Sequence, residues 1–258
     1  MEKIVVIGQI EYFVAYSTLT SRFVFGNLSL MPSRKDVFVN GGIYHIFNKT
    51  IDKRRIFSDE SICRVFLDVV SYYRSTKADI RYSRFLKLEP FIKRQKENEI
   101  RYKKYFKVIV LSYCLMPNHF HLLLKQKIEG GIIRFVADTI NAFTRFYNIL
   151  HERKGPLFLT QFKSRRVRTT EELMHVSRYI HLNPYSGGLV DSFEQLEKYR
   201  WSSLPDYLGS VDRGLCDEEI VLNMFDGEKG KYRAFVRQQA EYQKRLEQAK
   251  HRDELLES

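Results

Sequence analysis

The sequence has few cysteines and no long apolar run. Its three cysteines, Cys63, Cys114 and Cys216, are far apart and form no Cys-x-x-Cys pair. This spacing suggests neither a disulfide framework nor a zinc ribbon, and it fits a reducing cytoplasm. No run of about 18 apolar residues occurs, so we expect no transmembrane helix and no membrane partner. Internal repeats and low-complexity segments are missing as well.

Acidic residues are outnumbered by basic ones. The chain has 258 residues, with 43 Lys and Arg against 31 Asp and Glu, and a net charge of +12 at pH 7. Such an excess favours a polyanionic partner, of which nucleic acid is the commonest. The alternative is a merely basic, well-solvated surface. Because the basic residues are clustered along the chain, nucleic acid is the preferred interpretation.

Residues 113–125 form a strand pattern that contains two histidines. His119 and His121 flank a single apolar residue, and the side chains of a strand alternate between its two faces, so both imidazoles point the same way. The Met-Pro-Asn sequence at residues 116–118 predicts a β-hairpin turn, which places the histidines at the rim of a sheet. Two imidazoles side by side form half of a metal site.

Other segments predict a mixture of strands and helices. Residues 41–49 alternate as a strand does, and a lone histidine in such a strand, here His45, is more often structural than a ligand. Apolar residues recur at helical spacing in residues 58–73 and 131–153. A further helix begins at Thr169 or Thr170, and we expect it to finish near Pro184 because proline cannot continue a helix.

Two segments concentrate basic residues. Residues 77–104 interleave basic and aromatic side chains, which suits either a groove for phosphates and unpaired bases or a solvated helical insertion. Residues 162–168 carry four basic residues and no acid. We interpret this second segment as a strand or loop that contacts DNA phosphates. Its basic residues are Lys163, Arg165, Arg166 and Arg168.

The last predicted helix supplies further candidates. Tyr179 and Asn183 are four residues apart and therefore share one helix face. An amide oxygen beside two imidazoles suits Mg²⁺ or Mn²⁺ that also binds a substrate phosphate, and a tyrosine one turn away could attack that phosphate in line. His181 lies roughly opposite Tyr179 on the helix, so we leave it out of the metal site.

The two central motifs resemble the hallmark motifs of single-tyrosine HUH transposases, and the closer match is the REP-associated tyrosine transposase branch. These motifs are Leu115-Met-Pro-Asn-His-Phe-His-Leu-Leu-Leu124 and Arg178-Tyr-Ile-His-Leu-Asn-Pro184. Supporting matches are Gly42-Ile-Tyr-His-Ile-Phe-Asn48, Gly155-Pro-Leu-Phe158, Phe162-Lys-Ser164 and Trp201-Ser-Ser203. Together the matches span about residues 36–209.

The resemblance implies a ferredoxin-like α+β domain whose antiparallel sheet carries the histidine pair on a central strand. It implies cleavage of single-stranded DNA, often at the foot of a hairpin, with Mg²⁺ or Mn²⁺ as cofactor. By this likeness Tyr179 is the nucleophile, His119 and His121 are metal ligands, and Asn183 is the third ligand. Related insertion-sequence enzymes have Gln where Asn183 stands.

We therefore expect a transposase-like nuclease and strand transferase over residues 36–209, with residues 77–104 as an insertion. Residues 210–258 are expected to form a helical tail, and the active form to be a monomer or a homodimer. Residues 1–35 are an N-terminal extension, either upstream of a working start at Met31 or contributing an extra strand. The alternative function is a domesticated DNA- or RNA-binding protein that keeps the fold and no longer cleaves.

Overall fold

The computed structural model describes residues 37–256, with side chains described as far as residue 249. The chain divides into residues 1–35 and Asp36–Ser258, and all described residues belong to the second unit. The expectations for residues 1–35 therefore lie outside the described residues. No helix in the described part is long and apolar enough to span a membrane.

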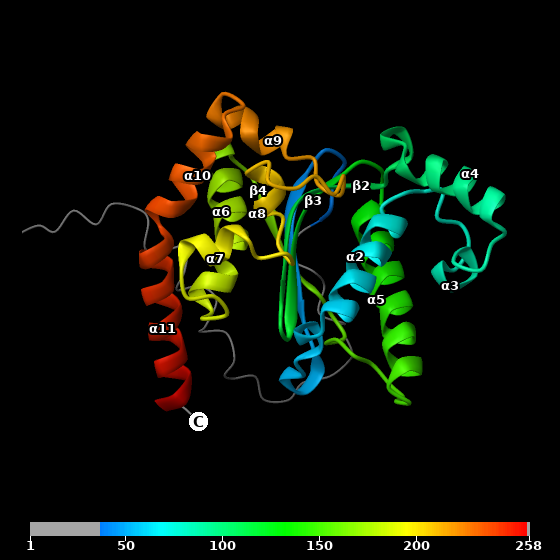
Figure 1. Ribbon diagram of the computed structural model, residues 1–258, viewed down its shortest axis with the longest axis horizontal. Coiled ribbons are helices and arrows are strands. Elements are labelled where there is room, and N and C mark those ends of the chain that lie inside the picture. Colours follow the sequence, from blue (N-terminus) through cyan, green and yellow to red (C-terminus); the bar gives the residue numbers. More distant parts are fainter. Residues whose placement is uncertain (1–36, 257–258) are drawn as a thin grey trace, which may run out of the picture. The chain divides into compact units, whose positions relative to one another are not determined.

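Four antiparallel strands form one sheet in the order β2-β3-β1-β4. The chain visits them as β1-α2-β2-β3-α5-β4, which is the ferredoxin-like βαββαβ topology. This confirms the predicted α+β class and the place of the histidine pair on a central strand (Figure 1). The strands are β1 Ile43–Lys49, β2 Val108–Met116, β3 His119–Gln126 and β4 Lys163–Val167.

Two helices, α2 (Glu60–Tyr73) and α5 (Gly131–Leu150), cover one face of the sheet (Figure 1). Helix α2 starts where its apolar stripe begins, because the side chain of Asp59 accepts a 2.7 Å hydrogen bond from the backbone N–H of Ser61. The aromatic rings of this layer interlock: the centroid of Phe66 lies 5.0 Å from the centroids of both Phe120 and Phe143. Because this core occupies one face of the sheet, the functional side chains of β3 must lie on the other face.

The opposite face is covered by α6 (Thr170–Ser186) and by the segments that follow it. The C-terminal region is helical, as expected, and it packs on α6: Tyr232 and Val236 of α10 are fully buried in the same apolar cluster as residues of α6. The remaining helices of this layer are α7 Phe193–Glu197, α8 Leu204–Tyr207, α9 Glu219–Leu222, α10 Lys229–Gln238 and α11 Ala240–Leu256.

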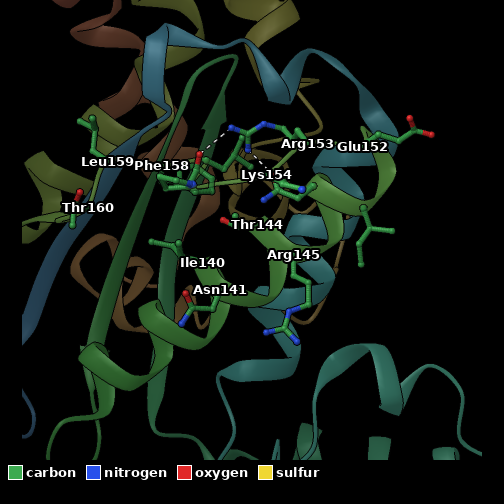
Figure 2. Close-up of a pocket in the computed structure, with 14 residues that line it drawn as sticks. Ile140, Asn141, Thr144, Arg145, Glu152, Arg153, Lys154, Phe158, Leu159 and Thr160 are labelled. Carbon is green, nitrogen blue, oxygen red and sulfur yellow. Dashed lines mark hydrogen bonds between the residues drawn. The ribbon is translucent and has the colours of Figure 1, made fainter.

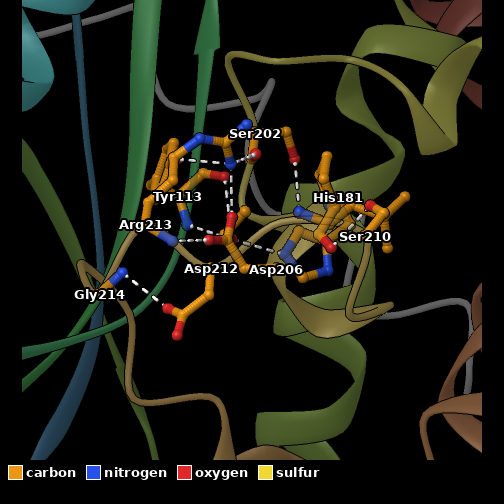
Figure 3. Close-up of polar contacts among 11 residues, drawn as sticks. Tyr113, His181, Ser202, Asp206, Ser210, Asp212, Arg213 and Gly214 are labelled. Carbon is orange, nitrogen blue, oxygen red and sulfur yellow. Dashed lines mark hydrogen bonds and ion pairs between the residues drawn. The ribbon is translucent and has the colours of Figure 1, made fainter.

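A buried polar network joins α6 to this C-terminal region. The two ring nitrogens of His181 lie 2.7 Å from the hydroxyl oxygens of Tyr232 and Ser203, and the ring is fully buried. Burial lowers the pKa of His181 from 6.5 to about 3, so the ring is neutral. Nearby, buried Asp206 pairs with Arg213 (Figure 3). His181 therefore serves packing and lies apart from the histidine pair.

Helix α6 ends at Ser186, near Pro184 as expected, and it includes the proline and two residues after it. Proline has no N–H to donate to the carbonyl of Ile180, four residues earlier. The side-chain nitrogen of Asn183 takes that place and donates to Ile180 O at 3.4 Å and to Tyr179 O at 2.9 Å. The helix can therefore accommodate the proline.

The basic segment at residues 77–104 is helical. It contains α3 (Tyr82–Phe85) and α4 (Pro90–Arg101). Its aromatic side chains divide into two groups: Phe85 is buried, with its ring centroid 4.8 Å from that of Tyr72, whereas Phe91 is 73% exposed. Part of the aromatic content therefore anchors the insertion to α2 and is not available to stack on bases.

Candidate active site

The histidine pair lies at the start of β3, on the sheet face that α6 covers. In the strand register Lys49 pairs with His119 and Phe47 pairs with His121, and paired residues project from the same face. The ring centroids of His119 and His121 are 5.0 Å apart, and the ring planes are nearly perpendicular, at 83°. The predicted pairing of the two imidazoles on one face is thus present.

Helix α6 brings Tyr179 to this pair. The centroid of the Tyr179 ring lies 5.8 Å from that of His121, with an angle of 89° between the planes. Its centroid lies 6.0 Å from that of His45, at 70°. His121 and Tyr179, which are 58 positions apart along the chain, therefore meet edge to face.

His45 is the residue whose contact the sequence pattern did not predict. Its Nε2 lies 2.9 Å from Nδ1 of His121, and both rings are buried. One proton lies between these nitrogens. The alternation of residues 41–49 placed His45 on one strand face, but only the register between β1 and β3 shows that this face is also that of His121. That register depends on pairing between segments that are far apart in the sequence.

Each histidine of the pair has one ring nitrogen engaged and one available for a ligand. Nδ1 of His119 lies 2.7 Å from the side-chain oxygen of Asn118. Nδ1 of His121 faces His45, and Nε2 of His121 is buried with no hydrogen-bond partner among the described residues. An orphaned imidazole nitrogen at a buried position suits a metal ion, since ligating histidines commonly engage their second nitrogen in a hydrogen bond.

The site keeps its histidines neutral. Burial, with a smaller contribution from the charge of Lys49, lowers the pKa of His119 from 6.5 to about 4. Burial also lowers the pKa of His121 well below 6.5, and the neighbouring His119, His45 and Lys49 act in the same direction. Burial and the charge of Arg165 lower the pKa of His45 to about 3. Neutral imidazole is the form that binds metals.

Asn183 lies one turn after Tyr179 on α6. Its amide nitrogen donates to two carbonyls of the helix, which leaves its carbonyl oxygen as the side-chain atom for a ligand. Within the described residues, no group of three or more His, Cys, Asp and Glu side chains is placed to hold a metal ion. The sequence prediction of His119, His121 and Asn183 as ligands stays a prediction.

Strand alternation separates the four basic residues predicted to contact DNA. Arg165 pairs with His45, and Lys163 pairs with Phe47, so both are on the site face of β4. Arg166 pairs with Tyr44, which belongs to the opposite face, and Arg168 follows the end of the strand. The guanidinium of Arg165 also lies 3.9 Å from the carboxylate of Glu172. The structure thus places only Lys163 and Arg165 beside the histidines.

Comparison with known proteins finds similarity among solved structures. No protein-family model and no curated protein matches the sequence. Among solved structures, the chain is similar to a REP-associated tyrosine transposase bound to a REP hairpin, with a TM-score of 0.48 and 15% sequence identity. The match covers 72% of this chain and 88% of that chain.

Proposed function

We propose that this protein is a metal-dependent endonuclease and strand transferase for single-stranded DNA, with Tyr179 as its nucleophile. One observation carries the proposal: the ring of Tyr179 meets His121 edge to face at 5.8 Å, and Nε2 of His121 is buried without a partner among the described residues. A tyrosine that only packs does not explain why a buried imidazole nitrogen beside it has no hydrogen-bond partner in the described part of the chain. A nucleophile next to a metal site explains it, because the metal ion is then the partner of that nitrogen.

In the proposed reaction the phenol oxygen of Tyr179 attacks a DNA phosphorus. A bond forms between this oxygen and phosphorus, the phenol loses its proton, and the bond from phosphorus to one sugar oxygen breaks. That sugar oxygen leaves as a hydroxyl after gaining a proton. The product is a phosphotyrosine ester, which keeps a phosphodiester bond for rejoining to another strand.

His119, His121 and Asn183 are the proposed ligands of Mg²⁺ or Mn²⁺. When bound, such an ion polarises the non-bridging phosphate oxygens and stabilises the charge of the transition state. The chain itself contributes neutral imidazoles and a strand that fixes the two histidines relative to each other. The net charge of +12 supports a polyanionic substrate, proposed here to be single-stranded DNA at the foot of a hairpin.

The test is cleavage of an end-labelled single-stranded hairpin oligonucleotide with Mn²⁺. We expect cleavage by the unmodified protein, none in EDTA, and loss of at least 10²-fold in His121→Ala because a metal ligand is removed. His151→Ala is the matched control, since His151 is exposed and is the C-cap residue of α5. Equal activity in His121→Ala and His151→Ala would contradict the proposal.

A non-cleaving DNA- or RNA-binding protein is the second function to separate. It predicts tight binding of the same oligonucleotide with no product under any metal condition. No contact among the described residues favours it specifically, so the cleavage assay decides between the two functions.

A further inference from the structure

A groove of about 820 Å³ opens between α5 and the segment that follows it. Arg145 and Arg153 lie on the α5 side, and Leu159 and Thr160 lie on the other (Figure 2). The volume is in the range of pockets that hold a nucleotide-sized ligand. The site described above does not use this groove.

Hydrogen bonds join the wall of this groove to the rim that carries His119. The N–H of Leu159 donates to Lys49 O at 2.9 Å, and the side chain of Asn48 donates to Leu159 O at 3.0 Å. Lys49 is the register partner of His119. Hydrogen bonds at the end of β1 therefore link the groove wall to the rim of the sheet, although α5 covers the opposite face of the sheet from the histidine pair.

The loop between the rim and the groove is basic, and we call residues 49–55 the rim loop. Its N–H groups at Thr50 and Ile51 donate to Asn118 O at 2.8 Å and to Leu157 O at 3.0 Å, so the loop contacts both the hairpin turn before His119 and the groove. The rim loop and groove together hold seven basic side chains against the acids Asp52 and Glu152. These basic residues are Lys49, Lys53, Arg54, Arg55, Arg145, Arg153 and Lys154.

Acidic side chains do little to neutralise the charge of these seven basic side chains. None of them takes part in an ion pair among the described residues. Arg153 is committed to the loop, where it donates to Asn148 Oδ1 and Pro156 O. The charge of Lys49 reaches the site, because it contributes to the lowered pKa of His119. Basic side chains thus occur both in the rim loop and along the groove.

The rim loop is also strained. Asp52 and Lys53 follow one another with φ of 58° and 52°, in the left-handed region that residues with a Cβ rarely adopt. Such a conformation persists only where the surroundings hold it. Here the bonds to Asn118 and Leu157 hold the start of the loop, and the Thr50 hydroxyl donates to Arg54 O at 2.7 Å across the turn. The basic side chains are therefore presented on a fixed turn.

We propose that the rim loop and groove bind the unpaired DNA strand on one side of the reacting phosphate. This inference rests on the proposed function for the position of that phosphate. Basic side chains follow the phosphates, and the exposed apolar side chains of Ile149 (74%) and Leu159 (45%) offer surfaces to the faces of bases. A duplex hides those base faces, so the groove selects a single strand.

The first test measures binding of an oligothymidylate strand in EDTA as a function of salt. In Arg54→Gln/Arg145→Gln/Lys154→Gln, we expect the slope of log K against log salt to become less steep by about 2, at about 0.7 for each lost phosphate contact. The control removes three exposed basic residues of the insertion, Arg84→Gln/Lys87→Gln/Arg94→Gln. An unchanged slope in the first variant, or equal changes in both, overturns the proposal.

The second test places a photo-crosslinking phenylalanine analogue at Ile149 in the groove or at Phe91 on α4, which is 73% exposed. We expect crosslinks to the single strand from position 149 and few from position 91 or to the matching duplex. Equal crosslinking yields from both positions, or a preference for duplex, would contradict binding of the single strand in the groove. Both tests use no metal, so they can succeed even where cleavage fails, and failure here leaves the tyrosine chemistry intact.

Discussion

His45 Nε2 lies 2.9 Å from His121 Nδ1, and this hydrogen bond joins the two central strands behind the histidine pair. For His121 to bind a metal through Nε2, that nitrogen must be unprotonated and the ring proton must be on Nδ1. Nε2 of His45 then accepts the hydrogen bond that the Nδ1–H group of His121 donates. The contact fixes both the orientation and the tautomer of a proposed ligand, which is the usual task of residues behind a metal site.

Replacing His45 tests this relationship. We expect His45→Leu to weaken Mn²⁺ binding about 10- to 100-fold, because His121 loses the acceptor that holds its proton on Nδ1. His45→Gln keeps an acceptor oxygen and should retain most of the affinity. Electron paramagnetic resonance titration of free Mn²⁺ gives the affinity without any activity assay. Equal affinity in His45→Leu and the unmodified protein would show that His45 only packs.

Asn183 should matter for stability as well as for the site. Asn183→Leu removes the donor that reaches Ile180 O, and we expect it to lower the free energy of unfolding by about 1–3 kcal/mol. In the background of Pro184→Ala the same change should cost less, because residue 184 regains the N–H that can bond to Ile180 O. Urea unfolding of the four proteins provides the double-mutant cycle. A cost that is equal in both backgrounds would exclude this compensation.

Much of the fold follows from local pattern. The alternation at residues 41–49, the Pro-Asn turn before His119 and the apolar stripe from residue 131 predict β1, the β2–β3 hairpin and α5, which the structure contains. At Pro184 local pattern predicts the approximate end of α6 but not the two further residues, because the donor that replaces the missing N–H is a side chain. Proline position alone does not reveal such a substitute.

The candidate site, like the fold, could be predicted only in part from local pattern. Strand periodicity puts His119 and His121 on one face, but it carries no information about which side chains of other strands share that face. The contact between His45 and His121, the placement of Arg165 and not Arg166 on the site face, and the contact of the rim loop with Leu157 all depend on pairing between distant segments. Long-range register is what the sequence alone did not supply.

The buried network around His181 predicts an effect on folding without an effect on the site. Tyr232→Phe leaves His181 Nδ1 and Ser177 Oγ without the hydroxyl that lies 2.7 Å and 2.6 Å from them. We expect a loss of about 1–3 kcal/mol in the free energy of unfolding. Tyr242→Phe is the control, because Tyr242 is 55% exposed. Equal free energies of unfolding for the two variants in urea would show that the Tyr232 hydroxyl does not stabilise the fold.

The lowered histidine pKa values predict acid sensitivity. In the folded protein the pKa of His181 is about 3, against 6.5 for an exposed ring, so the unfolded chain binds a proton that the folded chain does not. Stability from this group is complete above pH 6.5 and is lost as the pH falls toward about 3, at up to about 1.4 kcal/mol per pH unit.

Urea unfolding in EDTA between pH 7 and pH 4.5 measures this dependence. His181→Gln cannot take up the proton, so its unfolding free energy should fall less steeply with decreasing pH than that of the unmodified protein. Parallel pH dependence in the two proteins would contradict a neutral, buried His181.

The central claim is that Tyr179 attacks a DNA phosphate, and mass-spectrometric mapping of the adduct tests it most directly. The protein is incubated with a single-stranded hairpin oligonucleotide and Mn²⁺, denatured, and digested with trypsin and nuclease. Tyr185→Phe is the matched control on the same helix, and Tyr179→Phe should form no adduct. The account predicts a nucleotide phosphate on the peptide that contains Tyr179. An adduct on another residue, or one that persists in Tyr179→Phe, would contradict it.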